Sequence, residues 1–321
     1  MVQGNRNGSS PTLSYECVRT PFTVQTMAFG VHSTPQVKSH KTHDKSHACG
    51  KTIFLRYGKI SDMNIFDTHA HFPEDPHKIP ELLERASAAG VSQLMAVGGS
   101  AELNRAALLT ASTAKASASA PTVRLALGLD RDQVGSACSS CPKYDFSIVI
   151  DNRKSISAIG EIGLDFHYSP ETSKAQCDLF AAQLELAKEL DLPVVIHTRD
   201  ADDSTLGVLD ENDFHNGIIH CFTGSVPFER KLLDRGFMIS ISGIVTFRAA
   251  ENVREAARYA PDDRLLIETD SPFLAPVPMR GNENEPSFLP YTLKFLAEQR
   301  NISPEALAIL TTDNAMRILK C

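Results

Sequence analysis

The segment LPVVIHT, Leu192–Thr198, is a short apolar run that ends in an ionisable side chain. Apolar runs of this length, bounded by polar residues, are typical of parallel strands that are buried on both faces. Seven further runs have a similar length and composition: NIFDTH (64–69), SQLMAVG (92–98), VRLALG (123–128), ISAIGEIG (156–163), GIIHCF (217–222), FMISISG (237–243) and RLLIETD (264–270). The chain therefore offers eight candidate strands.

Longer amphipathic stretches separate these runs. The stretch 171–190 is the clearest, because apolar residues recur at helical spacing: Ala175, Leu179, Ala182, Leu186 and Leu190. Eight such βα units between Met63 and Cys321 match the roughly 250 residues of a (β/α)8 barrel. The sequence therefore predicts an α/β fold, a (β/α)8 TIM barrel. An open doubly wound sheet is the alternative, but the GxGxxG turn that would support it is absent.

The first 62 residues differ from the rest. They hold 8 Lys and Arg against 3 Asp and Glu, are rich in Ser, Thr and His, and show no periodicity. We expect a disordered N-terminal extension over 1–62, whether an appended tail, an upstream-start artefact or a transit peptide, and the compact barrel domain over 63–321. The barrel would carry 24 basic and 36 acidic residues, a formal charge of −12. Such an acidic body is expected to bind duplex nucleic acid poorly, so any phosphate recognition has to be local.

The sequence lacks the usual signals for membrane insertion or secretion. No apolar run reaches the 18 or more residues of a membrane span, and no secretory signal opens the chain. Seven cysteines, an odd number, suit a reducing compartment better than a disulfide framework. We therefore expect a cytoplasmic protein without a membrane partner. The CSSC motif at Cys138–Cys141 lacks a second pair and is interpreted as incidental thiols rather than a zinc knuckle.

Ionisable side chains follow five of the eight predicted strands. They are His69 and His71 after strand 1, Glu161 at the end of strand 4, His197 after strand 5, His220 after strand 6 and Asp270 after strand 8. In a parallel barrel the carboxyl ends of all strands meet at one face, so these residues would converge. Four imidazoles and two carboxylates in one pocket need cations to hold them. We expect two divalent ions about 3.5–4 Å apart, bridged by Glu161.

These motifs resemble the signature segments of the TatD family of metal-dependent deoxyribonucleases, in the amidohydrolase-like superfamily. The segments are FDTHAHF, AIGEIGLDFH, LPVVIHTRDA, IIHCFTGS, ISISGIVTF and LLIETDSPFLAPVPMRG, in that order, and they cover the chain from Asn64 onward. The resemblance implies that one metal is held by His69, His71 and Asp270 and the other by His197 and His220. Glu161 would bind both metals.

The resemblance also implies roles in catalysis. Two metals around a water would suit phosphodiester hydrolysis, with Glu161 and Asp270 as the catalytic carboxylates. Asp270 could move a proton, or could serve as a ligand alone. Arg199 and Arg280 could clamp a phosphate, or could pair with loop carboxylates. Asp200 is expected to cap the helix that follows it.

The expected substrate is single-stranded DNA entered from its 3′ end, without an obligate protein partner. Imidazole ligands favour Zn or Mn, whereas nucleases that resemble this chain are described as using Mg, so the metal is Mg, Mn or Zn. A small-molecule amidohydrolase acting on a cyclic amide or ester is the alternative, although many such enzymes bridge their metals with a carboxylated lysine where this chain has Glu161. A non-catalytic barrel would lack ligands, and a serine hydrolase would need a GxSxG elbow that is absent.

Overall fold

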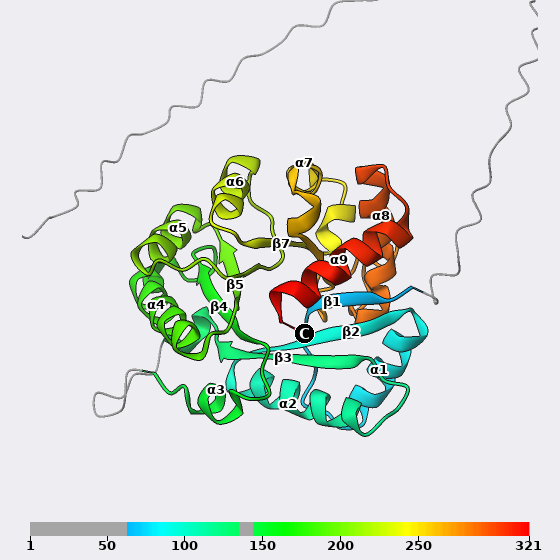
Figure 1. Ribbon diagram of the computed structural model, residues 1–321, viewed down its shortest axis with the longest axis horizontal. Helices are drawn as coiled ribbons and strands as arrows, with labels where there is room; N and C mark the ends of the chain where they lie inside the picture. The colour runs from blue at the N-terminus through cyan, green and yellow to red at the C-terminus, as the bar shows by residue number, and fades with distance from the viewer. Residues whose placement is uncertain (1–62, 135–143, 321) are drawn as a thin grey trace, which may run out of the picture. The chain divides into compact units, whose positions relative to one another are not determined.

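The computed structural model describes residues 63–134 and 144–320 (Figure 1). The predicted N-terminal extension, 1–62, and the CSSC motif lie outside the described residues. The described strands are β1 (Ile65–Ala70), β2 (Val91–Gly99), β3 (Thr122–Leu129), β4 (Ala158–Asp165), β5 (Val194–Arg199), β6 (Gly217–Ile219), β7 (Met238–Ile241) and β8 (Leu265–Ile267). Each strand coincides with one of the eight apolar runs of the sequence.

Helices alternate with the strands along the chain. They are α1 (Lys78–Ala88), α2 (Ala101–Lys115), α3 (Ser147–Asn152), α4 (Ser173–Leu190), α5 (Asp202–Glu211), α6 (Val226–Asp234), α7 (Glu251–Tyr259), α8 (Leu289–Arg300) and α9 (Pro304–Ile318). The predicted helix 171–190 is confirmed as α4, preceded by one 3-10 turn at Pro170–Thr172. Among the described residues, no helix combines the length and apolar character needed to cross a membrane.

The eight strands form one parallel sheet in the order β1 to β8. The sheet closes just beyond β8, where Ala70 and Ser271 form a parallel bridge. Two backbone hydrogen bonds reinforce this closure, from Asp270 N to His69 O (2.9 Å) and from His71 N to Ser271 O (2.8 Å). The predicted (β/α)8 barrel is confirmed, and its closure joins the segments that carry three of the expected ligands.

Apolar side chains fill the barrel interior, and α9 covers one end of it. The interior cluster takes at least one residue from every strand: Phe66, Met95, Val97, Ala126, Ala158, Val195, Ile218, Met238 and Leu266. Ala315 of α9 and Leu319 belong to the same cluster, and α9 crosses the barrel opening in Figure 1. Several of these strand residues lie near the start of their strand, so α9 covers the amino-terminal end.

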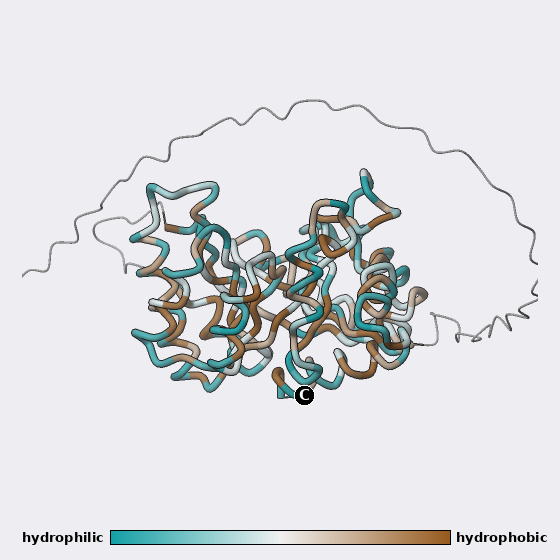
Figure 2. The backbone as a smooth tube through the Cα atoms, turned by 90° about the horizontal axis from the view of Figure 1, so that it is seen from above, coloured by the Kyte–Doolittle hydropathy of each residue, from teal (hydrophilic) through white to brown (hydrophobic). Residues whose placement is uncertain are grey.

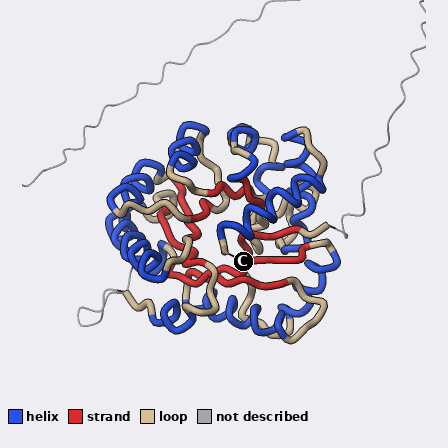
Figure 3. Tube along the Cα trace, in the orientation of Figure 1, coloured by secondary structure: helices blue, strands red, loops and turns tan. Residues whose placement is uncertain are grey.

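The second core lies between the strands and the surrounding helices. Figure 3 shows the strands as an inner ring with helices outside it, and Figure 2 shows apolar residues along the inner segments and hydrophilic residues on the outer turns. Fully buried Ile79, Phe180 and Leu293 supply this layer from α1, α4 and α8. Burying such side chains stabilises each helix against the sheet by roughly 1.5–3 kcal/mol per residue. The carboxyl-terminal end of the barrel is thereby left to loops and to polar residues.

Candidate metal centre

The six predicted ligands lie at the carboxyl-terminal end of the barrel, on or just after five strands. All are buried except His197, whose side chain is 19% exposed. One detail of the prediction is wrong: β4 does not end at Glu161. It continues to Asp165, because Leu164 and Asp165 still pair with β5. Glu161 therefore lies within the strand, deeper in the barrel than a loop residue would.

A close approach of β4 and β5 brings Glu161 next to His197. Gly163 has a φ of +124°, and a Cβ atom there would come within 2.1 Å of the His197 carbonyl oxygen. A side chain at this position would be strained and would push the two strands apart. The glycine thus permits the contact on which the arrangement of the centre depends.

The four imidazoles form two pairs. His69 Nε2 lies 3.1 Å from His71 Nε2, and His197 Nδ1 lies 3.1 Å from His220 Nε2. Two nitrogens bound to one tetrahedral zinc ion would be about 3.3 Å apart, given Zn–N bonds near 2.0–2.1 Å. Each pair is therefore spaced like two ligands of one ion.

Glu161 lies between the two histidine pairs. Its Oε2 is 3.5 Å from His69 Nε2 and 3.4 Å from His71 Nε2. Its Oε1 is 3.3 Å from His197 Nδ1 and 3.5 Å from His220 Nε2. Burial would raise the pKa of Glu161, but the charge of His220 and hydrogen bonds from the histidines hold it well below its usual value. Each carboxylate oxygen thus faces its own pair of imidazoles.

Asp270 faces the first histidine pair. Its Oδ1 is 3.9 Å from His69 Nε2 and 4.0 Å from His71 Nε2. Its backbone φ is 56°, a left-handed conformation that is uncommon outside glycine and is often found at functional sites. Burial raises the pKa of Asp270 to about 7 against the attraction of His220, and neighbouring Glu268 raises it further. The raised pKa means that a positive charge beside the Asp270 carboxylate, such as a bound cation, would stabilise its ionised form.

The donor set fits a metal ion. Three overlapping groups each bring one ligand atom per residue within 4.8 Å of the others: His69, His71 and Glu161; Glu161, His197 and His220; and His69, His220 and Asp270. Burial lowers the pKa of His69 to about 3, whereas at His220 the carboxylates of Glu161 and Glu268 outweigh burial and raise the pKa well above its usual value. Neutral imidazoles and ionised carboxylates are the forms that bind divalent cations.

A second layer of contacts orients the histidines. His71 Nδ1 lies 2.9 Å from the Val97 carbonyl oxygen, and His197 Nε2 lies 3.1 Å from Asp165 Oδ2. Buried Glu268 approaches His220 Nδ1 at 3.5 Å. Metal-binding histidines commonly use their second nitrogen in this way. Sequence reasoning missed Asp165 and Glu268, although both stand within the quoted GEIGLD and IETD segments.

Arg131 is a third residue that the sequence prediction missed. It lies in the 3-10 turn Arg131–Val134 after β3, and its Nη1 donates to Glu161 Oε1 at 3.0 Å. The two arginines that were predicted lie elsewhere on this end of the barrel. Arg199 stacks on Tyr168, 4.8 Å from the ring centroid, and Arg280 stacks on Phe247 at 4.0 Å. Arg131 is therefore the guanidinium in contact with the predicted bridging carboxylate.

The expected role of Asp200 as a helix cap is wrong. Ala201 is the N-cap residue of α5, and no side chain caps that helix. The Asp200 carboxylate instead pairs with exposed His167, with a 2.9 Å separation between Oδ2 and Nδ1.

Asp67 joins two segments that are distant in the sequence. Its carboxylate accepts hydrogen bonds from Thr269 N (2.9 Å) and Thr269 Oγ1 (2.6 Å) and so ties β1 to the end of β8.

A TIM barrel with histidines and carboxylates gathered at the carboxyl ends of its strands is the architecture of a metal-dependent hydrolase. The sequence profile of the TatD related DNase family matches residues 66–320. The chain belongs to this family, and the predicted resemblance is confirmed.

Several relatives support the assignment. The chain is 34% identical over 271 residues to the uncharacterized metal-dependent hydrolase YabD of Bacillus subtilis, covering 80% of this chain and 99% of the relative. It is 37% identical over 183 residues to the 3'-5' ssDNA/RNA exonuclease TatD of Salmonella typhimurium, covering 55% and 70%. The crystal structure of YJJV, a TatD homolog from Escherichia coli, superimposes with a TM-score of 0.71 at 27% identity, covering 80% and 98%.

Proposed function

We propose that this protein is a phosphodiester hydrolase that removes nucleotides from the 3′ end of single-stranded DNA, and that it uses two divalent cations. One observation carries the proposal: each oxygen of Glu161 faces a separate pair of imidazoles, 3.3–3.5 Å away. A carboxylate between two ligand pairs suits a two-metal site. The name of the Salmonella relative supports nucleic acid as the substrate class.

The residues divide between the two proposed ions. His69, His71 and Asp270 would hold one, His197 and His220 the other, and Glu161 both. When bound, two such ions activate water at neutral pH and stabilise the negative charge that develops on phosphate oxygens. The ligand set is compatible with Mg, Mn or Zn.

Asp270 would also move the proton. Its Oδ1 lies at the edge of the ligand cluster, so it is placed to accept a proton from the attacking water and return it to the leaving oxygen. The alternative role is ligation alone. Asp270→Asn separates them, because loss of turnover with retained metal indicates proton transfer, whereas parallel loss of both indicates ligation.

Three guanidinium groups could bind phosphate near this centre. Arg131 lies at the centre itself, because its guanidinium contacts Glu161. Arg199 and Arg280 lie on aromatic rings of the surrounding loops, where they could hold phosphates further along a strand. Each of these proposed phosphate contacts involves a single arginine, because the net negative charge of the chain gives no broad attraction to nucleic acid.

A single-stranded end suits this distribution of charge better than a duplex, because Arg131 contacts Glu161 directly while the chain as a whole is acidic. The cytoplasmic location expected from cysteine usage remains a prediction.

The test is digestion of a labelled single-stranded oligonucleotide by protein loaded with Mg, Mn or Zn. We expect products that shorten one nucleotide at a time from the 3′ end. Equal digestion of a circular strand would contradict end-dependent action. Hydrolysis of a cyclic amide, without cleavage of the oligonucleotide or of a bis-aryl phosphate, would indicate the amidohydrolase alternative.

A further inference from the structure

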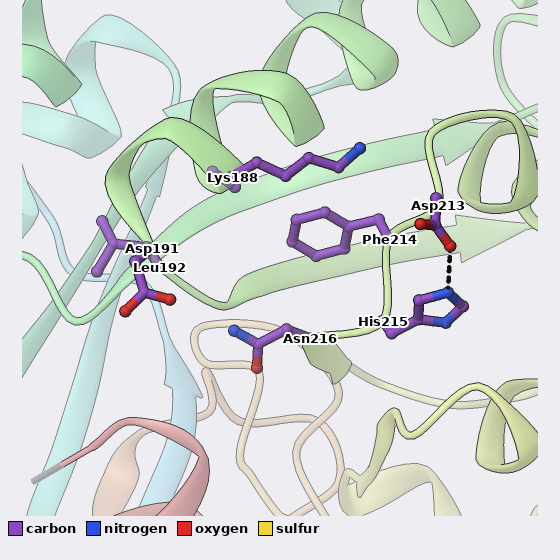
Figure 4. A pocket seen from close by; sticks show the side chains of 8 residues that line it. Lys188, Asp191, Leu192, Asp213, Phe214, His215 and Asn216 are labelled. Carbon is purple, nitrogen blue, oxygen red and sulfur yellow. Dashed lines mark hydrogen bonds and ion pairs between the residues drawn. The ribbon is translucent and has the colours of Figure 1, made fainter.

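Two hollows lie at opposite ends of the barrel. The larger, about 330 Å³, borders the starts of β5 and β6 and is lined by residues such as Lys188, Asp191 and His215 (Figure 4). Two of its ionisable side chains, Asp213 and His215, already contact each other, with 2.9 Å between Oδ1 and Nε2. This pair therefore has no unsatisfied group to offer a ligand. The smaller hollow, about 280 Å³, is lined by His71 and therefore borders the metal centre.

The smaller hollow is mainly apolar. Its walls come from the loop after β1, from α1 and α2, and from the loop between β8 and α8. The apolar lining residues are Phe72, Pro73, Leu82, Leu103, Pro272, Phe273 and Pro286. A space of this size is near the lower end of those that hold small organic ligands. It suits one flat ring system rather than a longer chain.

Phe273 is an exposed aromatic ring beside a predicted ligand. It is 60% exposed, and its ring centroid lies 6.5 Å from that of His71. Its backbone is fixed, because Phe273 N donates to Asp270 O (3.0 Å) and Asn284 Nδ2 donates to Phe273 O (2.6 Å). A ring that is both exposed and anchored can stack on a nucleobase with little loss of conformational freedom.

Ser271 lines the same hollow and carries a buried polar atom without a partner in the described part of the chain. The residue is 2% exposed, and its Oγ has no hydrogen-bond partner among the described residues. A buried hydroxyl without a partner is costly, so a ligand atom that bonds to it would be favoured. Nucleobases and sugars carry such donors and acceptors.

The charges around the hollow select against an anion. Its charged lining residues besides the histidine are acidic: Glu283, which is exposed, and Glu285, which Arg85 holds at 2.6 Å. A phosphate would be repelled by Glu283, whereas a neutral base would not. The anionic part of a nucleotide would therefore lie toward the metal centre, with the base in the hollow.

We infer that this hollow binds the base of the 3′-terminal nucleotide, stacked on Phe273 and hydrogen-bonded through the Ser271 hydroxyl. The inference rests on the proposed nuclease function and adds the group that the enzyme recognises. Phe273 and Ser271 act as substrate-positioning residues.

The test crosses protein variants with substrates that lack a base. Three oligonucleotides are compared: one intact, one abasic at the 3′-terminal position and one abasic at the penultimate position. The proteins are wild type, Phe273→Ala, Phe273→Tyr and Ser271→Ala. Tyr259→Ala is the control, because Tyr259 is a 44% exposed aromatic ring at the end of α7, outside the hollow.

We expect Phe273→Ala to lower kcat/KM for the intact oligonucleotide by about 5- to 150-fold, the range for loss of one base–aromatic stack. The loss should persist with the penultimate abasic substrate and vanish with the terminal one. Phe273→Tyr should restore activity, Ser271→Ala should cost about 2- to 12-fold, and metal content should stay unchanged in all variants.

An equal loss on all three substrates, or a loss that vanishes only with the penultimate abasic substrate, would overturn the terminal-base site and leave the nuclease function intact. Failure of metal-loaded wild type to cleave any of the three would overturn the nuclease function itself, and the base site with it. The two failures are thus distinguishable.

Discussion

Asp165 Oδ2 lies 3.1 Å from His197 Nε2, and this contact leaves Nδ1 as the nitrogen of His197 that faces Glu161 and His220. The contact also fixes the plane of the imidazole. His197 is the least buried of the six predicted ligands, so it depends most on such support.

Removing the charge of Asp165 should weaken metal binding. We expect Asp165→Asn to lower metal affinity by about 10- to 100-fold, the usual cost of losing a carboxylate behind a histidine ligand. Titration of the metal against a chelator measures the affinity of each protein. Asp213→Asn is the matched control, because Asp213 makes a similar 2.9 Å contact with His215 on the surface. Equal affinities for wild type and Asp165→Asn would contradict this prediction.

Arg131 should contribute to substrate binding more than to metal binding. Its guanidinium reaches Glu161 Oε1 at 3.0 Å while 22% of the side chain remains exposed, so it can also contact a phosphate. Loss of a hydrogen bond to a charged group costs about 1.5–3 kcal/mol. We expect Arg131→Met to lower kcat/KM on oligonucleotides by about 10- to 150-fold with metal content unchanged.

The control for Arg131→Met is Arg230→Met, which removes a 72% exposed arginine from α6. Unchanged turnover of Arg131→Met would refute the phosphate role, and loss of bound metal would assign Arg131 to the support of Glu161 instead.

Glu229 should make stability depend on pH. It is fully buried in α6, and neither carboxylate oxygen has a hydrogen-bond partner among the described residues. Burial raises its pKa to about 8, despite the opposing charge of Arg300. Between its ordinary value of 4.5 and pH 8, the folded protein therefore keeps a proton that the unfolded chain releases. The stabilisation is complete below pH 4.5 and is lost as pH rises through 8.

Glu229→Gln should remove this dependence. The free energy of unfolding of the variant minus that of wild type should be about 2 kcal/mol larger at pH 8 than at pH 6. The reason is that each pH unit corresponds to about 1.4 kcal/mol. Urea unfolding at both values measures the difference, and exposed Glu255→Gln serves as the control. A constant difference between variant and wild type at the two pH values would show that Glu229 is ionised in the folded protein.

The sequence predicted the barrel because its periodic features are strong. Each strand is a short buried apolar run, and the direction of parallel strands alone brings residues as distant as His69 and Asp270 to one face. Features that depend on one side chain left no such signal. Asp165 and Arg131 are single charged residues near strand ends, and their partners are decided by the packing of neighbouring strands. Asp200 was misread because helix-capping preference is a local rule, whereas its contact with His167 joins two loops.

The central claim is that Glu161 joins two metal sites, and metal content measured together with turnover tests it most directly. We predict two divalent ions per chain in wild type, and in Glu161→Gln fewer than two ions with oligonucleotide cleavage reduced by at least about 100-fold, since both sites lose their shared carboxylate. A Glu161→Gln protein that keeps two ions and wild-type turnover would contradict the claim.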